Sequence, residues 1–147
     1  MEAKTLPPRS EAPQEETWNL QSIFPDVKAW EKAYKDFEKR LSEIDAFKGK
    51  INQNHETLLK CLTLSEDILR GAEKVAVYSG LDSQTDASDQ DALARAGQGD
   101  GLMNKAATAV SFIEPELMSI GLEKLRKWMD RTGLKVCVDS EQVMIYL

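Results

Sequence analysis

The sequence predicts an all-α protein, an antiparallel bundle of about four helices that follows an extended N-terminal leader. Two observations support this fold class. Apolar residues recur at helical spacing through most of residues 27–133. The chain also lacks the G-x-G-x-x-G loop and the strand–helix alternation that are typical of α/β proteins. Its 147 residues suffice for one ordinary domain.

Three segments differ in composition. Residues 1–16 contain three prolines and four glutamates and almost nothing to bury, so we expect an extended, mobile leader. Residues 17–135 form the expected helical domain. Residues 136–147 are rich in β-branched side chains and carry no helical stripe, so an irregular tail is expected there.

The first helix is expected over about residues 27–45. Asp26 is placed to cap it, because a side-chain oxygen at that position can accept a hydrogen bond from an unpaired backbone amide. Five large apolar residues are spaced 4, 3, 4 and 3 along one face, namely Trp30, Tyr34, Phe37, Leu41 and Ile44. We expect this face to be core packed against the second helix, and Gly49 to form the turn between the two.

The second helix is expected over about residues 55–83 and is capped by Asn54. Ser65 either caps a restart at an irregularity near Thr63–Ser65 or lies inside one long helix. One face of this helix carries mainly apolar residues, namely Leu58, Leu62, Leu69, Ala72, Ala76 and Ser79. Gly71 weakens its middle by about 1 kcal/mol relative to alanine.

The third helix is expected over roughly residues 87–113, with Asp86, Ser88 and Asp89 as possible caps. Glycines at 97, 99 and 101 would together cost about 2–3 kcal/mol of helix propensity, so a kink or break is predicted at 97–101. Pro115 suits the first turn of a fourth helix, which is expected to be interrupted near Gly121 and to end at Gly133.

The composition argues against several classes of partner. The net charge of −6 provides no attraction for nucleic acid or an anionic membrane. No apolar run approaches the roughly 18 residues of a membrane span, and no secretory signal is evident. Cys61 and Cys137 lie far apart without a CxxC neighbour, which is typical of reduced thiols, so a cytoplasmic location is expected.

Two stretches could suggest a metal site. His55–Leu59 begins like the zinc motif H-E-x-x-H, but its second histidine position holds Leu59, and the chain has a single histidine. Residues 82–91 contain four aspartates, but the glycine and glutamate positions of a calcium loop hold Ala87 and Leu93. We therefore expect a helix start at His55 and a polar loop with aspartate caps at 82–91.

No catalytic, metal-binding or cofactor-binding residue is predicted. Neither Cys61 nor Cys137 lies in a nucleophile motif, and both are expected to be buried or half-buried thiols. The aromatic face around Trp30 could bind a ligand or a partner, but aromatic residues at helical spacing are usually core.

Several segments in order resemble the N-terminal region of oligoendopeptidase F, in the M3 family of zinc metallopeptidases. The first is "RSEAPQEETWNLQSIFPDVKAWEKAY" at residues 9–34, in which an arginine–proline leader runs into Thr-Trp-Asn-Leu and then Ile-Phe-Pro. The others are "FKGKI" (47–51), "VYSGLDSQTD" (77–86) and "FIEPELMSI" (112–120), which is followed by Trp128. The resemblance covers about residues 9–135.

The resemblance implies a helical hydrolase region that packs over the catalytic domain and walls a channel for short peptides. It implies Zn²⁺ only in a full-length member, held by an H-E-x-x-H motif that this chain lacks. The chain is therefore expected to be an N-terminal fragment, truncated before the catalytic domain and inactive alone. Its expected partners are that domain or a peptide, and self-association through exposed apolar surface is also considered. The alternative is a standalone helical protein-interaction module without enzymatic activity.

Overall fold

A computed structural model describes residues 13, 15 and 17–129 of the chain. Most of the expected leader, the expected helix end at Gly133 and the expected tail at 136–147 therefore lie outside the described residues. All regular secondary structure within the described ranges is helical, which confirms the predicted fold class.

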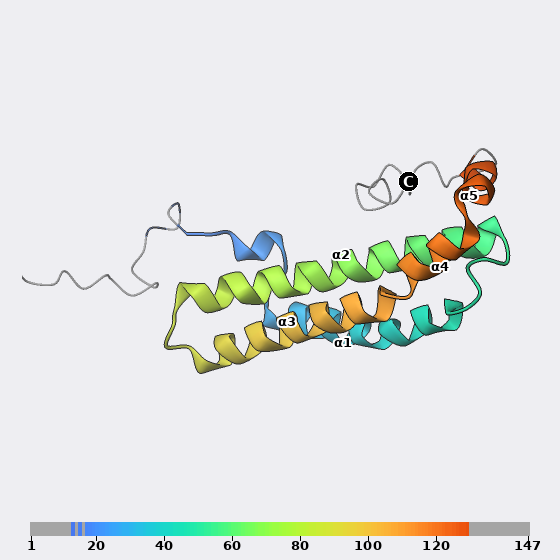
Figure 1. Cartoon of the computed structure of the whole chain (residues 1–147). Helices are drawn as coiled ribbons and strands as arrows, with labels where there is room; N and C mark the ends of the chain where they lie inside the picture. Colours follow the sequence, from blue (N-terminus) through green and yellow to red (C-terminus); the bar gives the residue numbers. More distant parts are fainter. Residues whose placement is uncertain (1–12, 14, 16, 130–147) are drawn as a thin grey trace, which may run out of the picture.

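Three long helices form the body of the molecule, and two short helices follow them at one end (Figure 1). The elements are a 3-10 helix at Leu20–Ser22, α1 at Val27–Ile44, a 3-10 helix at Asp45–Phe47, α2 at His55–Thr85, α3 at Gln90–Val110, α4 at Ile113–Ile120 and α5 at Leu122–Met129. The helix over 27–45 is thus confirmed, and the expected fourth helix is the pair α4–α5.

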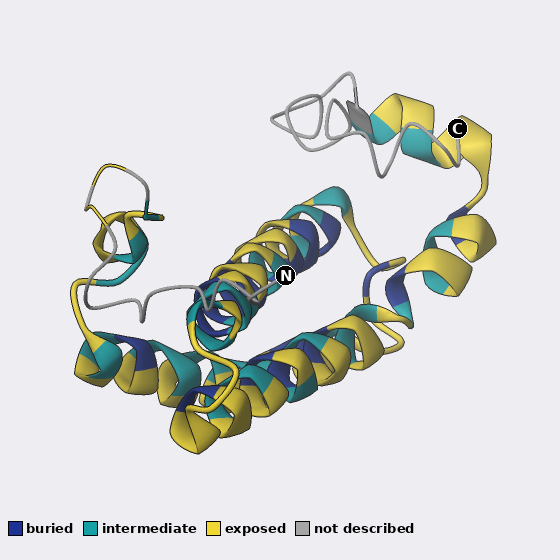
Figure 2. Cartoon of the chain, turned by 90° about the vertical axis from the view of Figure 1, so that its left-hand side faces the viewer, coloured by how far each residue is buried: buried dark blue, intermediate teal, exposed yellow. Residues whose placement is uncertain are grey.

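Helices α1 and α2 run antiparallel and share a core. The Trp30 side chain is 1% exposed, and its Nε1 donates a hydrogen bond to the Val75 carbonyl oxygen at 2.8 Å. Further along α1, the Phe37 ring packs directly on Gly71 of α2, where any side chain would collide with it. The apolar face of α1 is therefore core, as its spacing predicted, and Figure 2 shows such buried positions facing inward.

Helix α2 is continuous, so Ser65 lies inside one long helix and the alternative of an irregularity near Thr63–Ser65 is excluded. Ser65 is buried and its hydroxyl donates to the Leu62 carbonyl oxygen at 2.8 Å, which satisfies the hydroxyl without breaking the helix. The predicted face is also slightly displaced. Leu69 and Ala76 are only half-buried, whereas Cys61, Ile68 and Val75 are fully buried, because α2 has α1 on one flank and α3 beside it.

Helix α3 is also continuous, so the predicted break at 97–101 is wrong. Gly99 is buried against α2, and a Cβ atom there would collide with the Ser79 hydroxyl and lie 3.0 Å from Ala76 Cα. Close packing between α2 and α3 thus requires a glycine at this position and outweighs its low helix propensity. Nothing lies within 4 Å of the Cβ positions at Gly97 and Gly101.

The turns at the α4 end of the bundle agree with the sequence. Gly49 has a φ of 72° in the connection between α1 and α2. Gly121 has a φ of 81° and separates α4 from α5, and Pro115 lies in the first turn of α4. Positive φ values favour glycine, so these two residues allow the chain to change direction there.

Candidate functional site

His55 is the first residue of α2 and is half-buried. Asn54 caps this helix by accepting a hydrogen bond from the Thr57 amide at 2.8 Å, and Glu56 lies in the first turn, where the helix dipole favours negative charge. Leu59 occupies the position where a zinc motif needs its second imidazole. The structure thus confirms a helix start, and these residues do not fit a zinc site.

The aspartates of residues 82–91 have structural roles. Asp86 accepts hydrogen bonds from the amide and hydroxyl of Ser88 at 2.9 and 2.6 Å, and these bonds lower the pKa of its carboxyl group. Asp89 caps α3 by accepting from the amides of Asp91 and Ala92 at 3.0 and 2.9 Å. Asp82 pairs with an arginine of α3. The loop is therefore an interhelical connection with aspartate caps, as predicted.

Cys61 is a fully buried thiol in the middle of the core. Burial, with a smaller contribution from the Glu116 charge, raises the pKa of this thiol to about 12. A thiol with so high a pKa is protonated at neutral pH and is a poor nucleophile. The predicted core role of Cys61 is confirmed, and Cys137 lies outside the described residues.

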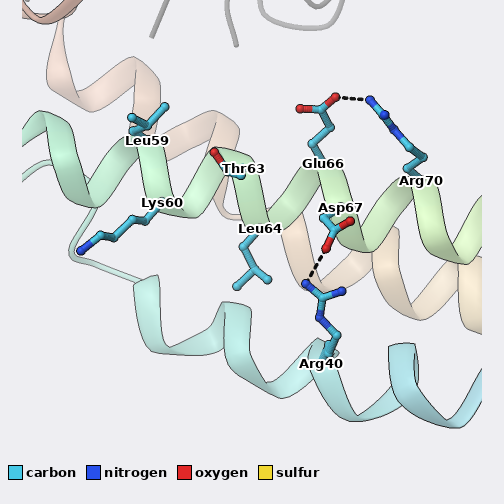
Figure 3. Close-up of a pocket in the computed structure, with 8 residues that line it drawn as sticks. All are labelled: Arg40, Leu59, Lys60, Thr63, Leu64, Glu66, Asp67 and Arg70. Carbon is cyan, nitrogen blue, oxygen red and sulfur yellow. Dashed lines mark hydrogen bonds and ion pairs between the residues drawn. The ribbon is translucent and has the colours of Figure 1, made fainter. Parts of the chain in front are cut away.

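A shallow hollow lies between α1 and α2 and is lined mainly by charged side chains (Figure 3). Arg40 of α1 pairs with Asp67 of α2 at 2.6 Å, and Glu66 pairs with Arg70 one turn further along α2. Leu64 points from α2 toward α1, beside the Arg40–Asp67 pair (Figure 3). The opposite charges already neutralise one another, so the hollow offers no unpaired charge from these four side chains to a ligand.

Two partly buried polar contacts were not predicted from the sequence. Arg95 Nη2 of α3 lies 2.7 Å from Asp82 Oδ2 of α2, and the two side chains are only 19% and 23% exposed. The Gly49 amide donates a hydrogen bond to Glu116 Oε1 at 2.6 Å, which links α4 to the turn before α2. Each contact joins residues on different helices or turns, and neither has a local sequence pattern that could have indicated it.

The described part of the chain offers no metal centre. Within residues 13, 15 and 17–129, no three histidine, cysteine, aspartate or glutamate side chains are grouped so that they could hold an ion. Among the same residues, no helix is both long and apolar enough to cross a bilayer.

Comparison with known proteins agrees with the resemblance found in the sequence. No family model matches the chain. Oligopeptidase PepF of Bacillus subtilis is 27% identical over 135 residues, which cover 91% of this chain and 20% of that protein. A plasmid-encoded oligoendopeptidase F of Lactococcus lactis subsp. cremoris is 26% identical over 122 residues, 82% of this chain and 20% of that protein. The chain thus spans about a fifth of the length of these relatives.

A solved structure shares the fold. The crystal structure of oligoendopeptidase F from Enterococcus faecium superposes with a TM-score of 0.69 at 20% identity, over 73% of this chain and 21% of that chain. The same helical arrangement therefore exists as a small part of a much longer polypeptide. The sequence and structural matches together relate this chain to the N-terminal region of oligoendopeptidase F.

Proposed function

We propose that this chain acts as a non-catalytic helical part of an M3-type oligoendopeptidase, where it forms one wall of the channel that admits short peptides. In this proposal it binds and positions, while the zinc-dependent cleavage belongs to residues that this chain does not contain. The observation that carries the proposal is the match of 91% of the chain to only 20% of Oligopeptidase PepF.

The chemistry of the chain supports a role without catalysis. Its single histidine lies at a helix start and has no second imidazole one turn away. Its fully buried thiol has a pKa of about 12. The aspartates at the α2–α3 connection cap helices or form an ion pair. Cys61 and three of these aspartates, Asp82, Asp86 and Asp89, thus have structural roles.

The surface of the chain supports a role in contact with other polypeptide. Five large apolar side chains are between 42% and 66% exposed, namely Trp18, Val77, Leu93, Met118 and Leu122. Met118 and Leu122 lie four residues apart at the α4–α5 end, and an apolar patch there would mark a contact with further protein. We propose that the partner is the catalytic part of an oligoendopeptidase, with peptide substrates passing between the two, in the cytoplasm.

A chimera tests this function directly. The 135-residue region of Oligopeptidase PepF that matches this chain would be replaced by the chain itself, and peptide hydrolysis would be measured. We expect hydrolysis well above that of PepF from which the region has simply been deleted. A matched control replaces the region by an unrelated helical bundle of similar length, which should not restore hydrolysis.

The alternative function, a standalone helical interaction module, predicts a different result. A chimera that is soluble and folded yet no more active than the deletion would contradict the proposal and favour the module. Circular dichroism and gel filtration of the chimera would establish that it is folded, so a loss of activity could be assigned to the replaced region.

A further inference from the structure

Helix α4 is fastened to a turn that lies far from it in the sequence. The Gly49 amide donates to Glu116 Oε1 at 2.6 Å across 67 residues. The positive φ of 72° at Gly49 is the backbone conformation in which its amide makes this bond. A bond between a backbone amide and a charged carboxylate is stronger than one between neutral groups.

A second polar contact fastens α5 to the same connection. Lys124 Nζ donates to the Asn52 carbonyl oxygen at 2.9 Å. The two contacts lie on opposite sides of Gly121, the residue at which α4 gives way to α5. The turn between α1 and α2 therefore holds both short helices, one through a carboxylate and one through an ammonium group.

Burying one oxygen of the Glu116 carboxylate costs free energy of hydration. Its second oxygen, Oε2, is buried and has no hydrogen-bond partner among the described residues. A carboxylate oxygen without a partner in the interior loses its hydration without compensation. Glu116 is half-buried, and the hydrogen bond from the Gly49 amide to its other oxygen, Oε1, links α4 directly to the turn.

Apolar packing alone holds α4–α5 less firmly than it holds the three long helices. Ile113 and Ile120, at the two ends of α4, are 8% and 9% exposed, whereas Met118 is 66% and Leu122 42% exposed. The long helices share many fully buried side chains and the Trp30–Val75 hydrogen bond, whereas α4 adds only Ile113 and Ile120 to the buried core. The packing of α4 and α5 on the body therefore depends less on buried apolar side chains than the packing among α1–α3 does.

We propose that Glu116 is a latch that fixes the α4–α5 arm, residues 113–129, on the turn between α1 and α2. When the latch is open, the arm pivots away and leaves the long helices intact. The inference rests on these contacts and does not depend on the proposed peptidase role.

Hydrogen exchange on the full chain tests the latch. Glu116→Ala removes the acceptor, and Glu116→Asp keeps the charge but shortens the side chain by one methylene, so neither can make the bond to Gly49. Both should speed exchange of the Gly49 amide and the α4 amides by roughly tenfold to a hundredfold, as loss of a charged hydrogen bond implies. Exchange in α1, α2 and α3 should be unchanged.

Two controls separate the latch from general destabilisation. Glu114→Ala alters an exposed glutamate of the same helix and should leave exchange as in the unaltered chain. Glu116→Gln retains an acceptor oxygen and should preserve most of the Gly49 protection. If Glu116→Asp left Gly49 exchange unchanged, or raised exchange equally across α1–α3, the latch would be refuted.

Thiol labelling gives a second measurement. Cys61 is fully buried, and the Glu116 charge is close enough to raise the pKa of its thiol. In a Cys137→Ser background, release of α4 should expose Cys61, so Glu116→Asp should increase its labelling rate at least about tenfold. An unchanged labelling rate would contradict an opening arm.

Discussion

Trp30 and Phe37 fix how α1 lies on α2, each by a different means. Trp30 buries its ring and also satisfies its N–H on the Val75 carbonyl oxygen. Phe37 is half-buried and depends on a gap in α2, because Gly71 offers no side chain at the point where the ring packs. The two aromatic residues thus set the spacing and register of the first two helices.

Truncation of the Phe37 ring tests this packing. Phe37→Ala should lower the free energy of unfolding by about 3 kcal/mol, toward the lower end of the range for aromatic truncations because the ring is only half-buried. Denaturant unfolding would measure the change. Val77→Ala, at a side chain that is 44% exposed, should change stability by no more than about 0.5 kcal/mol and serves as the control. Equal midpoints for the two variants would exclude Phe37 from the core.

At this scale the sequence predicted the aromatic face of α1 well and the buried face of α2 less well. The face of α1 is defined by large residues among charged ones, so its periodicity is plain. Helix α2 contacts two other helices, and its apolar residues therefore occupy more than one side. Ile68 and Val75 were missed for this reason, since no single stripe includes every residue that α1 and α3 bury.

Among the elements, α3 shows how packing between helices outweighs local propensity. Three glycines in five residues predicted a break, yet the helix continues from Gln90 to Val110. Only Gly99 faces α2 so closely that a side chain would collide with it. The cost of the glycines is offset by the close approach of α2 and α3, which no property of the α3 sequence alone could have revealed.

Alanine substitutions in α3 should therefore have opposite effects. Gly99→Ala should destabilise the protein by about 1–3 kcal/mol, because its Cβ would meet Ser79 and the α2 backbone. Gly97→Ala and Gly101→Ala place a Cβ in open space and should each stabilise by about 0.5–1 kcal/mol through helix propensity. Thermal unfolding would compare the three. A Gly99→Ala variant as stable as Gly97→Ala would contradict the close packing.

Helix ends were predicted more reliably than helix interiors. The caps at Asp26, Asn54 and Asp89 accept the expected backbone amides, and Gly49 and Gly121 have the positive φ expected of turns. These features depend on one residue and its immediate neighbours, so a short segment of sequence is enough to predict them. Contacts such as that of Glu116 with Gly49 depend on how elements distant in the sequence pack together, so short sequence segments cannot predict them.

For the whole molecule, we expect no peptide hydrolysis by this chain alone, with or without added zinc. Its one histidine cannot supply the two imidazoles of an H-E-x-x-H site. A quenched-peptide assay together with metal analysis of the purified chain would test this. Stoichiometric zinc that survives dialysis, with turnover abolished by His55→Ala, would show the expectation to be wrong.

The fold class followed from sequence periodicity, whereas the functional assignment rested on resemblance. The spacing of apolar residues in the sequence indicates where the long helices lie. The relation to oligoendopeptidase F leaves no such mark, because it depends on the order of short segments rather than on one periodic pattern. The order of segments from "TWNLQSIFP" to "FIEPEL" supplied what the single residues could not.

Exposed apolar side chains at the α4–α5 end predict self-association of the isolated chain. Met118 is 66% and Leu122 42% exposed, and the neighbouring Leu117, Leu125 and Trp128 are only half-buried. Apolar surface that no other protein covers drives association when it is large enough. Ile120, on the same helix as Met118, is 9% exposed and belongs to the core.

A charge-neutral pair of substitutions isolates this surface. Met118→Glu with Leu122→Lys keeps the net charge at −6, so any change reflects lost apolar contact rather than altered repulsion. We expect light scattering to show association of the unaltered chain that weakens at least about tenfold in this double variant. Val77→Glu with Leu93→Lys, which alters two exposed residues of α2 and α3, should change association much less. A chain that stays monomeric at high concentration, or equal effects of the two pairs, would show that the α4–α5 end is not the associating surface.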